Sequence, residues 1–432
     1  MQLVKSLSAL ALLGAAIPST YALSIKDDTF NVGVKLAIQT RAQFLNDADN
    51  ATGANYDPLR GTNGEAESVR FSLRRVRFGL AAKYGDWRAN FVIRGGEQTD
   101  RTDAANAAQT IQNVTVNGVV PPPATTVTVN SSTNGRPMQL YYANGARLFT
   151  TGEIVHDIHF GLDKPFNSES SISSSAMLFP TERIVAERIE TRNVGIGYGL
   201  RSSFVNFGFD LMNNSSGTKD PQAGSNTGAE ETNGYFYSAR IEIMPGKEYN
   251  PGKRQESYVG KEGFRVVGGL DAQWDDTSLT LNNSITTFAV TDTFTWGPDL
   301  LVHWNYFTFL AEARFRSTDV ETITDATGAS TSTTVDGRFG NVQLAYAIPM
   351  ESGYVVEPAV RYMIRDDNKA VDSSGVYGNN NDNGGEGTTI DLGVNLYFNG
   401  HANKLQLAYQ MWEAEAGEGQ ANILRLQHQV SF

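Results

Sequence analysis

The stretch SVRFSLRRVRFGL, residues 68–80, alternates between apolar and polar residues as a β-strand does, yet it holds four arginines within eight residues. Its alternation changes phase in the middle, because the apolar residues stand at odd positions up to residue 73 and at even positions from residue 76. One extra residue between Arg74 and Arg75, a β-bulge, would keep one face continuously apolar. We therefore predict a bulged strand that turns both arginines to its polar face.

The same period-two alternation recurs along the chain, for example in FNVGVKLAIQ (30–39) and TIDLGVNLYF (389–398). No stretch is apolar for 18 residues, as a transmembrane helix requires. A soluble β-sandwich would also alternate, so the connections have to separate the two architectures. Short, turn-like connections alternate with long polar segments along the chain. The short ones are expected near 85–86, 145–146, 200–202, 304–306, 349–353 and 399–402.

Alternating short and long connections are typical of an outer-membrane barrel, with tight periplasmic turns on one rim and long external loops on the other. We predict an all-β fold, a transmembrane antiparallel β-barrel of about 16 strands, with 14 to 18 left open by two weak segments. The strands are expected to start near residues 29, 69, 86, 138, 153, 191, 202, 234, 263, 291, 306, 336, 354, 388, 403 and 421.

Aromatic residues flank four of the short turns, as they do in barrels with aromatic girdles at the lipid headgroups, although strand propensity alone would explain any single pair. These pairs are Tyr84 and Trp87, Tyr198 and Phe204, Trp304 and Tyr306, and Tyr346 and Tyr354.

The first 22 residues have the organisation of a secretory signal peptide. Lys5 precedes an apolar run, and Thr20-Tyr21-Ala22 supplies the small residues of a cleavage site. The run is shorter than the roughly 20 residues that span a bilayer. We predict cleavage after Ala22 and a barrel domain over 23–432. Removal of one basic residue would bring the formal charge from −12 to about −13.

Composition excludes several classes of function. The acidic balance argues against nucleic acid as a partner, and the absence of cysteine excludes disulfides and thiolate metal sites. His156 and His159 are three residues apart, so in a strand they point to opposite faces and cannot share a metal. No serine and histidine stand at a spacing that predicts a hydrolase. We therefore expect no cofactor, no metal and no catalytic residue.

The alternation of side chains along the strands, with the bulge included, places six arginines on the inner face of two adjacent strands. An arginine facing lipid at mid-membrane would cost about 2 to 4 kcal/mol, so the lumen is the favourable location. We predict a cationic, anion-attracting pore lining, with balancing of acids in the wall as the alternative. The predicted lining consists of Arg70, Arg74, Arg75, Arg77, Arg88 and Arg94.

RRVRFGLAAKYGDWRANFVI (74–93) resembles the phosphate-selective porin O and P family, in which an Arg-Arg pair precedes an Asp-Trp turn. HFGLDKPFNSESSISSSAMLFPTERI (159–184) is similar to that family's third loop, and RLQHQVSF (425–432) to its ending. The resemblance implies a trimeric, sixteen-stranded porin of the Gram-negative outer membrane. It also implies that the third loop, 163–190 with Ser170 and Ser174, folds into the lumen as the constriction.

The resemblance is incomplete at two positions that matter for phosphate. Arg94 stands where the phosphate-specific members carry an Asp, and Ser170 where they carry a Lys, so phosphate specificity is not transferred. Glu153, Asp157 and Asp163 share the inward parity of their strand and are expected to form an acidic wall opposite the arginines. Such a transverse field is a feature of general diffusion porins.

We therefore expect a porin for passive diffusion of small hydrophilic solutes and ions, with an anion preference. The alternatives are a general or cation-preferring porin, and an occluded barrel that serves as a surface-binding or structural protein. Small inward residues such as Gly197, Gly199 and Gly208 favour an open channel. The expected partners are two further copies of the chain, outer-membrane lipid and lipopolysaccharide, and small permeant ions.

Overall fold

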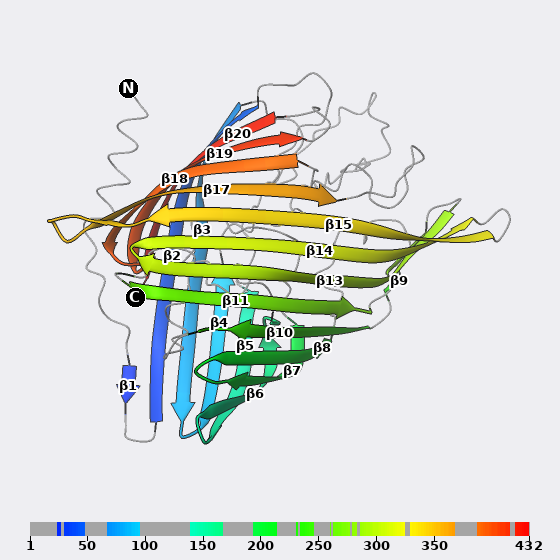
Figure 1. The fold of residues 1–432 in the computed structure, drawn as a ribbon, viewed down its shortest axis with the longest axis horizontal. Coiled ribbons are helices and arrows are strands. Elements are labelled where there is room, and N and C mark those ends of the chain that lie inside the picture. Colours follow the sequence, from blue (N-terminus) through cyan, green and yellow to red (C-terminus); the bar gives the residue numbers. More distant parts are fainter. Residues whose placement is uncertain are drawn as a thin grey trace, which may run out of the picture.

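The computed structural model describes residues 24–26, 30–47, 67–95, 139–166, 193–213, 230–231, 234–245, 260, 262–276, 279–282, 286–324, 329–367, 387–414 and 420–431. All of its regular elements are β-strands, joined into one sheet (Figure 1). Within these ranges no helix is long and apolar enough to cross a membrane. The predicted signal segment 1–22 lies outside the described residues.

Sixteen of the strands pair in sequence, and the last pairs with the first, so the sheet closes into a barrel. The ring runs β2 (Phe30–Asp47), β3 (Glu67–Tyr84), β4 (Trp87–Gly95), β5 (Gln139–Thr151), β6 (Ile154–Asp163), β7 (Asn193–Arg201), β8 (Val205–Asn213), β10 (Tyr235–Ile243), β11 (Glu262–Asp275), β13 (Thr286–Asn305), β14 (Phe307–Thr324), β15 (Ala329–Tyr346), β17 (Val355–Asp367), β18 (Gly387–Asn399), β19 (Asn403–Ala414) and β20 (Gln420–Ser431). Every pairing is antiparallel.

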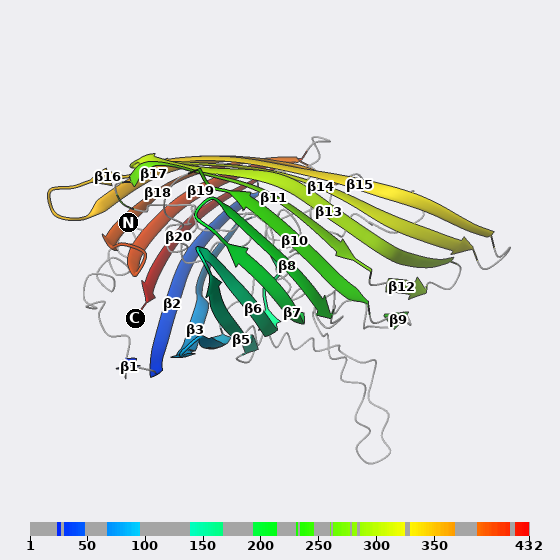
Figure 2. The same cartoon turned by 60° about the horizontal axis from the view of Figure 1, so that its bottom comes forward.

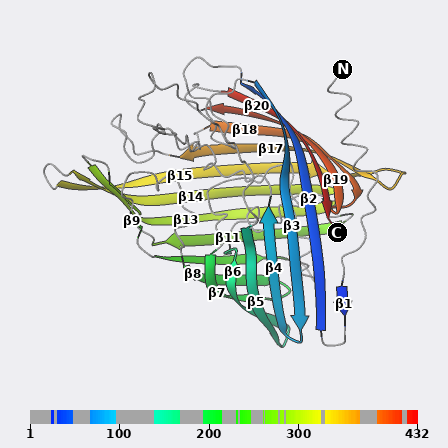
Figure 3. The same ribbon diagram turned by 180° about the vertical axis from the view of Figure 1, so that it is seen from behind.

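Four short strands extend this ring at its edges. β1 (Ser24–Lys26) pairs with β2, β16 (Ile348–Pro349) with β17, and β12 (Leu279–Asn282) with both β9 (Glu230–Glu231) and β13. Strands β11 to β17 cross the front of Figure 1, whereas β2 to β5 run steeply behind them. Figure 3 shows β2 to β5 in front, and Figure 2 shows the curvature of the wall. Strands on facing walls cross in this way because barrel strands tilt against the axis.

The predicted sixteen strands are confirmed, including the two weak ones, which became β5 and β13. One predicted turn is wrong. Residues 145–146 lie inside β5, and the turn falls at Gly152, whose φ of +63° suits a glycine. Gly145 gave the misleading signal, but it faces Phe160 across the strand pair and leaves room for that ring.

The outer face of the barrel is apolar and the inner face is polar. Along β7 and β8, for example, Val194, Ile196 and Phe207 are about half exposed on the outside, whereas Asn206 and Asp210 are buried inside. Such an exposed apolar band is the surface that a transmembrane barrel presents to lipid. Of the predicted girdle aromatics, six are exposed and Tyr198 and Tyr306 are partly buried: Tyr84, Trp87, Phe204, Trp304, Tyr346 and Tyr354 are the exposed ones.

The predicted bulge in β3 is confirmed. Gln39 of β2 faces Arg75 and the next residue, Thr40, faces Leu73, so Arg74 is the extra residue. Arg74 and Arg75 are 3% and 6% exposed on the inside, whereas Leu73 is 47% exposed on the outside. The extra residue thus places two consecutive arginines on one face of a strand.

Candidate functional site: the charged interior of the barrel

Four of the predicted arginines gather at mid-height on β3 and β4. Arg77 and Arg94 are cross-strand partners, and Arg75 lies within electrostatic range of both and of Arg74. Arg74 donates from Nη1 to Gln39 Oε1 over 2.9 Å. We call Arg74, Arg75, Arg77 and Arg94 the arginine cluster.

Tyr141 of β5 completes this cluster from the neighbouring strand. It is itself a bulged residue, because Val92 faces Tyr142 and Ile93 faces Leu140. Its hydroxyl accepts a 2.7 Å hydrogen bond from Arg77 Nη2. The Cζ atoms of Arg77 and Arg94 lie 4.4 Å and 5.2 Å from its ring centroid, within the range of cation–π contacts. A second bulge therefore supplies the neutral group around which the guanidinium groups are arranged.

The other two predicted arginines lie apart from the cluster. Arg70 is opposite Gln43 in the register of β2 and β3, further toward the long-loop end. Arg88 is exposed next to the turn at Gly85, where it faces Lys83. The structure thus gathers four of the six arginines at one level and separates these two along the barrel.

The predicted acidic wall is wrong in its position. Glu153 lies in the exposed turn between β5 and β6 and not on the wall. Asp157 and Asp163 do face inward on β6, but β6 is only three places from β3 in a ring of sixteen, so they lie on the same side. Asp157 pairs with Arg201 at 2.9 Å, and Asp163 accepts a hydrogen bond from Asn144. Parity correctly predicts the face of a residue but not its position around the ring.

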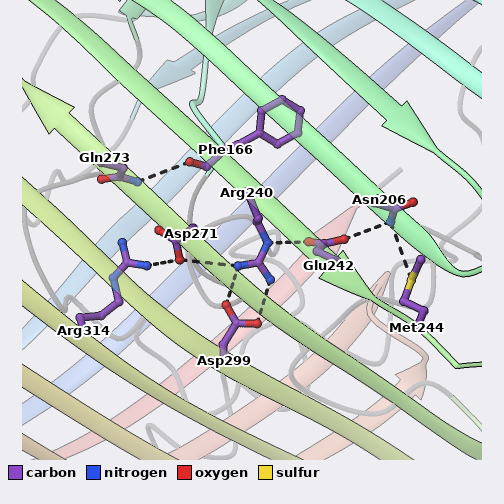
Figure 4. Close-up of polar contacts among 9 residues, drawn as sticks. All are labelled: Phe166, Asn206, Arg240, Glu242, Met244, Asp271, Gln273, Asp299 and Arg314. Carbon is purple, nitrogen blue, oxygen red and sulfur yellow. Dashed lines mark hydrogen bonds and ion pairs between the residues drawn. The ribbon is translucent and has the colours of Figure 1, made fainter.

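A different acidic set lies across the barrel, on β10 to β14 (Figure 4). Arg240 of β10 is at its centre, with bidentate contacts of 2.5 Å and 2.8 Å to Asp299 of β13 and a contact to Glu242. Asp271 of β11 lies 3.6 Å from Arg240 and is also paired with Arg314 of β14. We call these five residues the ionic network. Each of them is at most 6% exposed.

The sequence contains a signal for this network that is not part of any of the motifs described above. Arg240 and Glu242 stand two apart in the strand YFYSARIEI, so both face the same side, and that side is the lumen. Asp271 and Asp299 are likewise buried, inward-facing charges of their strands. A charge at an inward position of each of four consecutive strands would have indicated a shared cluster. What the sequence alone does not give is which arginine pairs with which acid.

The start of the predicted constriction loop turns onto the inner wall. Phe166 donates from its backbone N to Asp210 Oδ2 over 2.7 Å. Its backbone O accepts from Gln273 Nε2 over 3.4 Å, as Figure 4 shows. Its ring meets His159 edge-on, with the centroids 5.6 Å apart. His159 in turn contacts Asp210 Oδ1 at 2.7 Å. The rest of the loop, with Ser170 and Ser174, lies outside the described residues.

The small inward residues near this point do not leave open space, contrary to the expectation from sequence. A Cβ on Gly208 would lie 2.5 Å from the ring of Phe166, and one on Gly197 would lie 2.2 Å from His159 Nε2. A Cβ on Gly199 would lie 3.7 Å from the ring of Phe166. The missing side chains of these glycines therefore leave the space that Phe166 and His159 occupy.

The remaining inner wall, from β17 around to β2, is polar and closely paired. Arg361 of β17 contacts Asp391 of β18 at 2.5 Å, and both are buried. Glu357 accepts hydrogen bonds from Asn395 and from the hydroxyl of Tyr397. Glutamines link the next strands, as in the bond from Arg41 to Gln427. This wall therefore combines an ion pair with arginines that donate to amide oxygens.

The arrangement separates charge across the lumen. Counted from β2, β3 is the second strand and β13 the tenth, so the arginine cluster and the ionic network lie on opposite walls. The network holds three carboxylates and two arginines, and β14 adds one acid, Glu312, and one further arginine, Arg316, at inward positions on that side. A field of this kind acts on any ion or dipole that passes between the two walls.

Comparisons with known proteins give structural likenesses at low identity. No protein-family model matches the sequence, and no curated protein matches it. The outer-membrane channel DcaP of Acinetobacter baumannii is 14% identical, with a TM-score of 0.49 and coverage of 94% of this chain and 99% of that one. OmpT of Vibrio cholerae is 10% identical and OmpF of Salmonella typhi 12%, each with a TM-score of 0.49 and coverage of 95% of this chain and 100% of the other. The resemblance to the phosphate-selective porins stays a prediction.

Proposed function

We propose that the protein is an outer-membrane porin through which small hydrophilic solutes and ions diffuse passively. The observation that carries this proposal is the closed ring of sixteen strands with an apolar outside and a polar, charged inside. Barrels of 16 to 18 strands are wide enough to enclose an aqueous channel. Export by the segment 1–22 and assembly as a homotrimer belong to the same proposal. It includes no catalytic step.

The finer proposal is a preference for anions where the lumen passes the arginine cluster. Four guanidinium groups stay charged at any working pH, and each offers planar donors to a phosphate or carboxylate. At an effective dielectric of about 20, a unit charge about 4 Å away interacts by roughly 4 kcal/mol, so a fraction of this would bias permeation. Phosphate is one candidate anion among several, because Arg94 and Ser170 depart from the phosphate-specific pattern.

One charge-removal experiment separates anion preference from its main alternative. Replacing Arg74, Arg75 and Arg94 by alanine should move the zero-current potential, measured in a salt gradient across a planar bilayer, toward cation preference. High salt should reduce the shift wherever the passage is wide, because the charges are then screened. A wild-type pore that already prefers cations would mean that the acids of the opposite wall dominate, and the protein would be a general or cation-preferring porin.

A second candidate, an occluded barrel with a structural or binding role, is favoured by the burial of the inner wall. Gln343 and Glu357 are fully buried, and Arg361 is 1% exposed. Influx of small sugars into liposomes decides between the candidates, since an occluded barrel admits none. The same preparation should migrate as a heat-modifiable trimer that resists sodium dodecyl sulfate.

The proposed constriction loop can be tested at two positions. Its root at Phe166 lies on the inner wall, which supports a course through the lumen for 163–190. Cysteines placed at Ser170 or Ser174 should therefore reduce single-channel current when a bulky charged thiol reagent is added. Unchanged current at both positions would put the loop outside the lumen.

A further inference from the structure

One permanently charged side chain faces outward in the apolar band of β2 to β8. Arg147 of β5 is exposed, and its cross-strand partners are Trp87 of β4 and Ile158 of β6, which are 48% and 38% exposed on the outer face. Antiparallel partners share a face of the sheet, so Arg147 shares the lipid-facing side with both. It forms no ion pair with any residue in the described part of the chain.

The level of Arg147 along the barrel makes an outward charge tolerable. Its partner Trp87 follows the turn at Gly85-Asp86 directly, and the backbone N of the next residue, Leu148, donates to Asp86 O over 2.9 Å. Arg147 is therefore level with the short-turn rim and its aromatic residues. An arginine on the lipid face costs about 0 to 1 kcal/mol near this interface, against about 2 to 4 kcal/mol at the midplane.

The outer surface around Arg147 carries further polar groups in a fixed arrangement. The guanidinium Cζ lies 5.7 Å from the ring centroid of Trp87. Next to it, the imidazole of His156 stacks on Phe149, with centroids 4.7 Å apart and planes at 10°. The Nδ1 atom of that imidazole is 2.7 Å from the hydroxyl of Tyr198, and the position of its ring is thus set from two sides. Phe149 and Tyr198 share the outer face with Arg147.

We propose that Arg147, His156 and Tyr198 form a binding site for the phosphate of a phospholipid headgroup at the short-turn rim. The guanidinium of Arg147 donates to phosphate oxygens, and the hydrogen-bonded pair of His156 and Tyr198 keeps one further N–H or O–H donor for them. Trp87 and Phe149 flank these donors where the glycerol and upper acyl chains would lie. A headgroup is favoured over free phosphate because the donors lie within an apolar band and not in the lumen. The inference rests on the membrane placement in the proposed function, but not on conductance.

Native mass spectrometry of the detergent-purified full-length protein tests the site directly. We expect one phosphatidylglycerol to bind more tightly than diacylglycerol, which has the same chains and no phosphate. Arg147→Ala should weaken that one binding event by about tenfold, since it removes the charged donor. Arg147→Lys should recover part of the affinity, and Tyr198→Phe should weaken binding less. The matched control is Arg338→Ala, an exposed, outward-facing arginine of β15 far from the short-turn rim.

Several outcomes would overturn the proposal. These are equal binding by Arg147→Ala and wild type, an equal loss in Arg338→Ala, and binding of diacylglycerol as tight as that of phosphatidylglycerol. Displacement of the lipid by inorganic phosphate at similar concentration would mean a free-anion site instead. Heat-modifiable migration and unchanged single-channel conductance of Arg147→Ala show that its barrel is intact. Conductance is measured separately from lipid binding. If the wild-type protein forms no channel but Arg147→Ala still weakens lipid binding, the porin proposal is refuted and the lipid-site proposal stands.

Discussion

Two groups of arginines face each other across the lumen, and they differ in what holds them. Arg240 and Arg314 lie among Glu242, Asp271 and Asp299, so their charge is matched within a few ångströms. The arginine cluster on β3 and β4 has neutral groups among its hydrogen-bond acceptors, the amide of Gln39 and the hydroxyl of Tyr141. The ionic network depends on pairing, whereas the cluster depends on strand register, since a bulge brings Arg74 and Arg75 to one face.

The difference shows that arginine can serve two purposes in a barrel, to link neighbouring strands and to create an electric field in the lumen. A guanidinium surrounded by carboxylates ties neighbouring strands together, and its field cancels at a distance. Guanidinium groups gathered side by side repel one another, but their fields add up in the lumen. Removing a charge should therefore affect stability on one wall and selectivity on the other.

The largest expected contrast comes from deleting single residues of β3. Deleting Arg74 removes the bulge and leaves Arg75 opposite Gln39 and Leu73 opposite Thr40, so both faces of the strand stay in register. We expect this variant to fold and to show a smaller move toward cation preference than the triple alanine variant. Deleting Phe78, in the regular part of the strand, would turn apolar residues inward and arginines outward, and we expect no folded barrel. The folded fraction is read from heat-modifiable migration, and equal yields of the two variants would contradict the register argument.

The next largest effect is expected from Arg240→Ala. The change would remove the guanidinium that pairs with buried Glu242 and Asp299 and one of the two that face Asp271, and removing one partner of a buried ion pair typically costs about 3 to 5 kcal/mol. Unfolding by guanidinium chloride in detergent gives the free energy of unfolding. Arg94→Ala is the matched control, because it removes a charge from a group of like charges. If Arg94→Ala costs as much as Arg240→Ala, the distinction between paired and gathered arginines fails.

The smallest effect is expected when a matched pair is removed as a whole. Arg361→Met combined with Asp391→Asn nearly keeps the side-chain volumes and takes away one charge of each sign, so neither member of the ion pair is left buried without the other. We expect the free energy of unfolding to be unchanged or raised and the zero-current potential to stay where it is. A shift in potential as large as that of the triple alanine variant would show that Arg361 acts on permeating ions despite its partner.

The fold was predictable because its signals are local. Alternation, short turns and inward arginines can be read within ten residues, and the phase change at Arg74 and Arg75 located a bulge that the register confirms. The failure at residues 145–146 has a local cause as well, since a glycine that makes room for Phe160 looks like a glycine that makes a turn.

The site was predictable only in part, because its partners come from distant strands. Parity placed Asp157 on the inner face, but its contact with Arg201 and its distance from the arginine cluster follow from ring order. The pairing of Arg240 with Asp299 joins residues 59 apart in sequence. Whether a small residue such as Gly208 opens the lumen or receives a ring depends on Phe166, more than 40 positions away.

The pocket that receives Phe166 on the inner wall has a consequence for how the sequence of this loop can evolve. The position of the loop root is encoded in the wall, by the missing side chains of Gly197 and Gly208 and by the carboxylate of Asp210 that holds the backbone of Phe166. The described contacts of this anchor are made by Phe166 and the wall. Substitutions further along the loop would leave both partners of these contacts in place. Specificity and attachment can thus evolve separately within one loop.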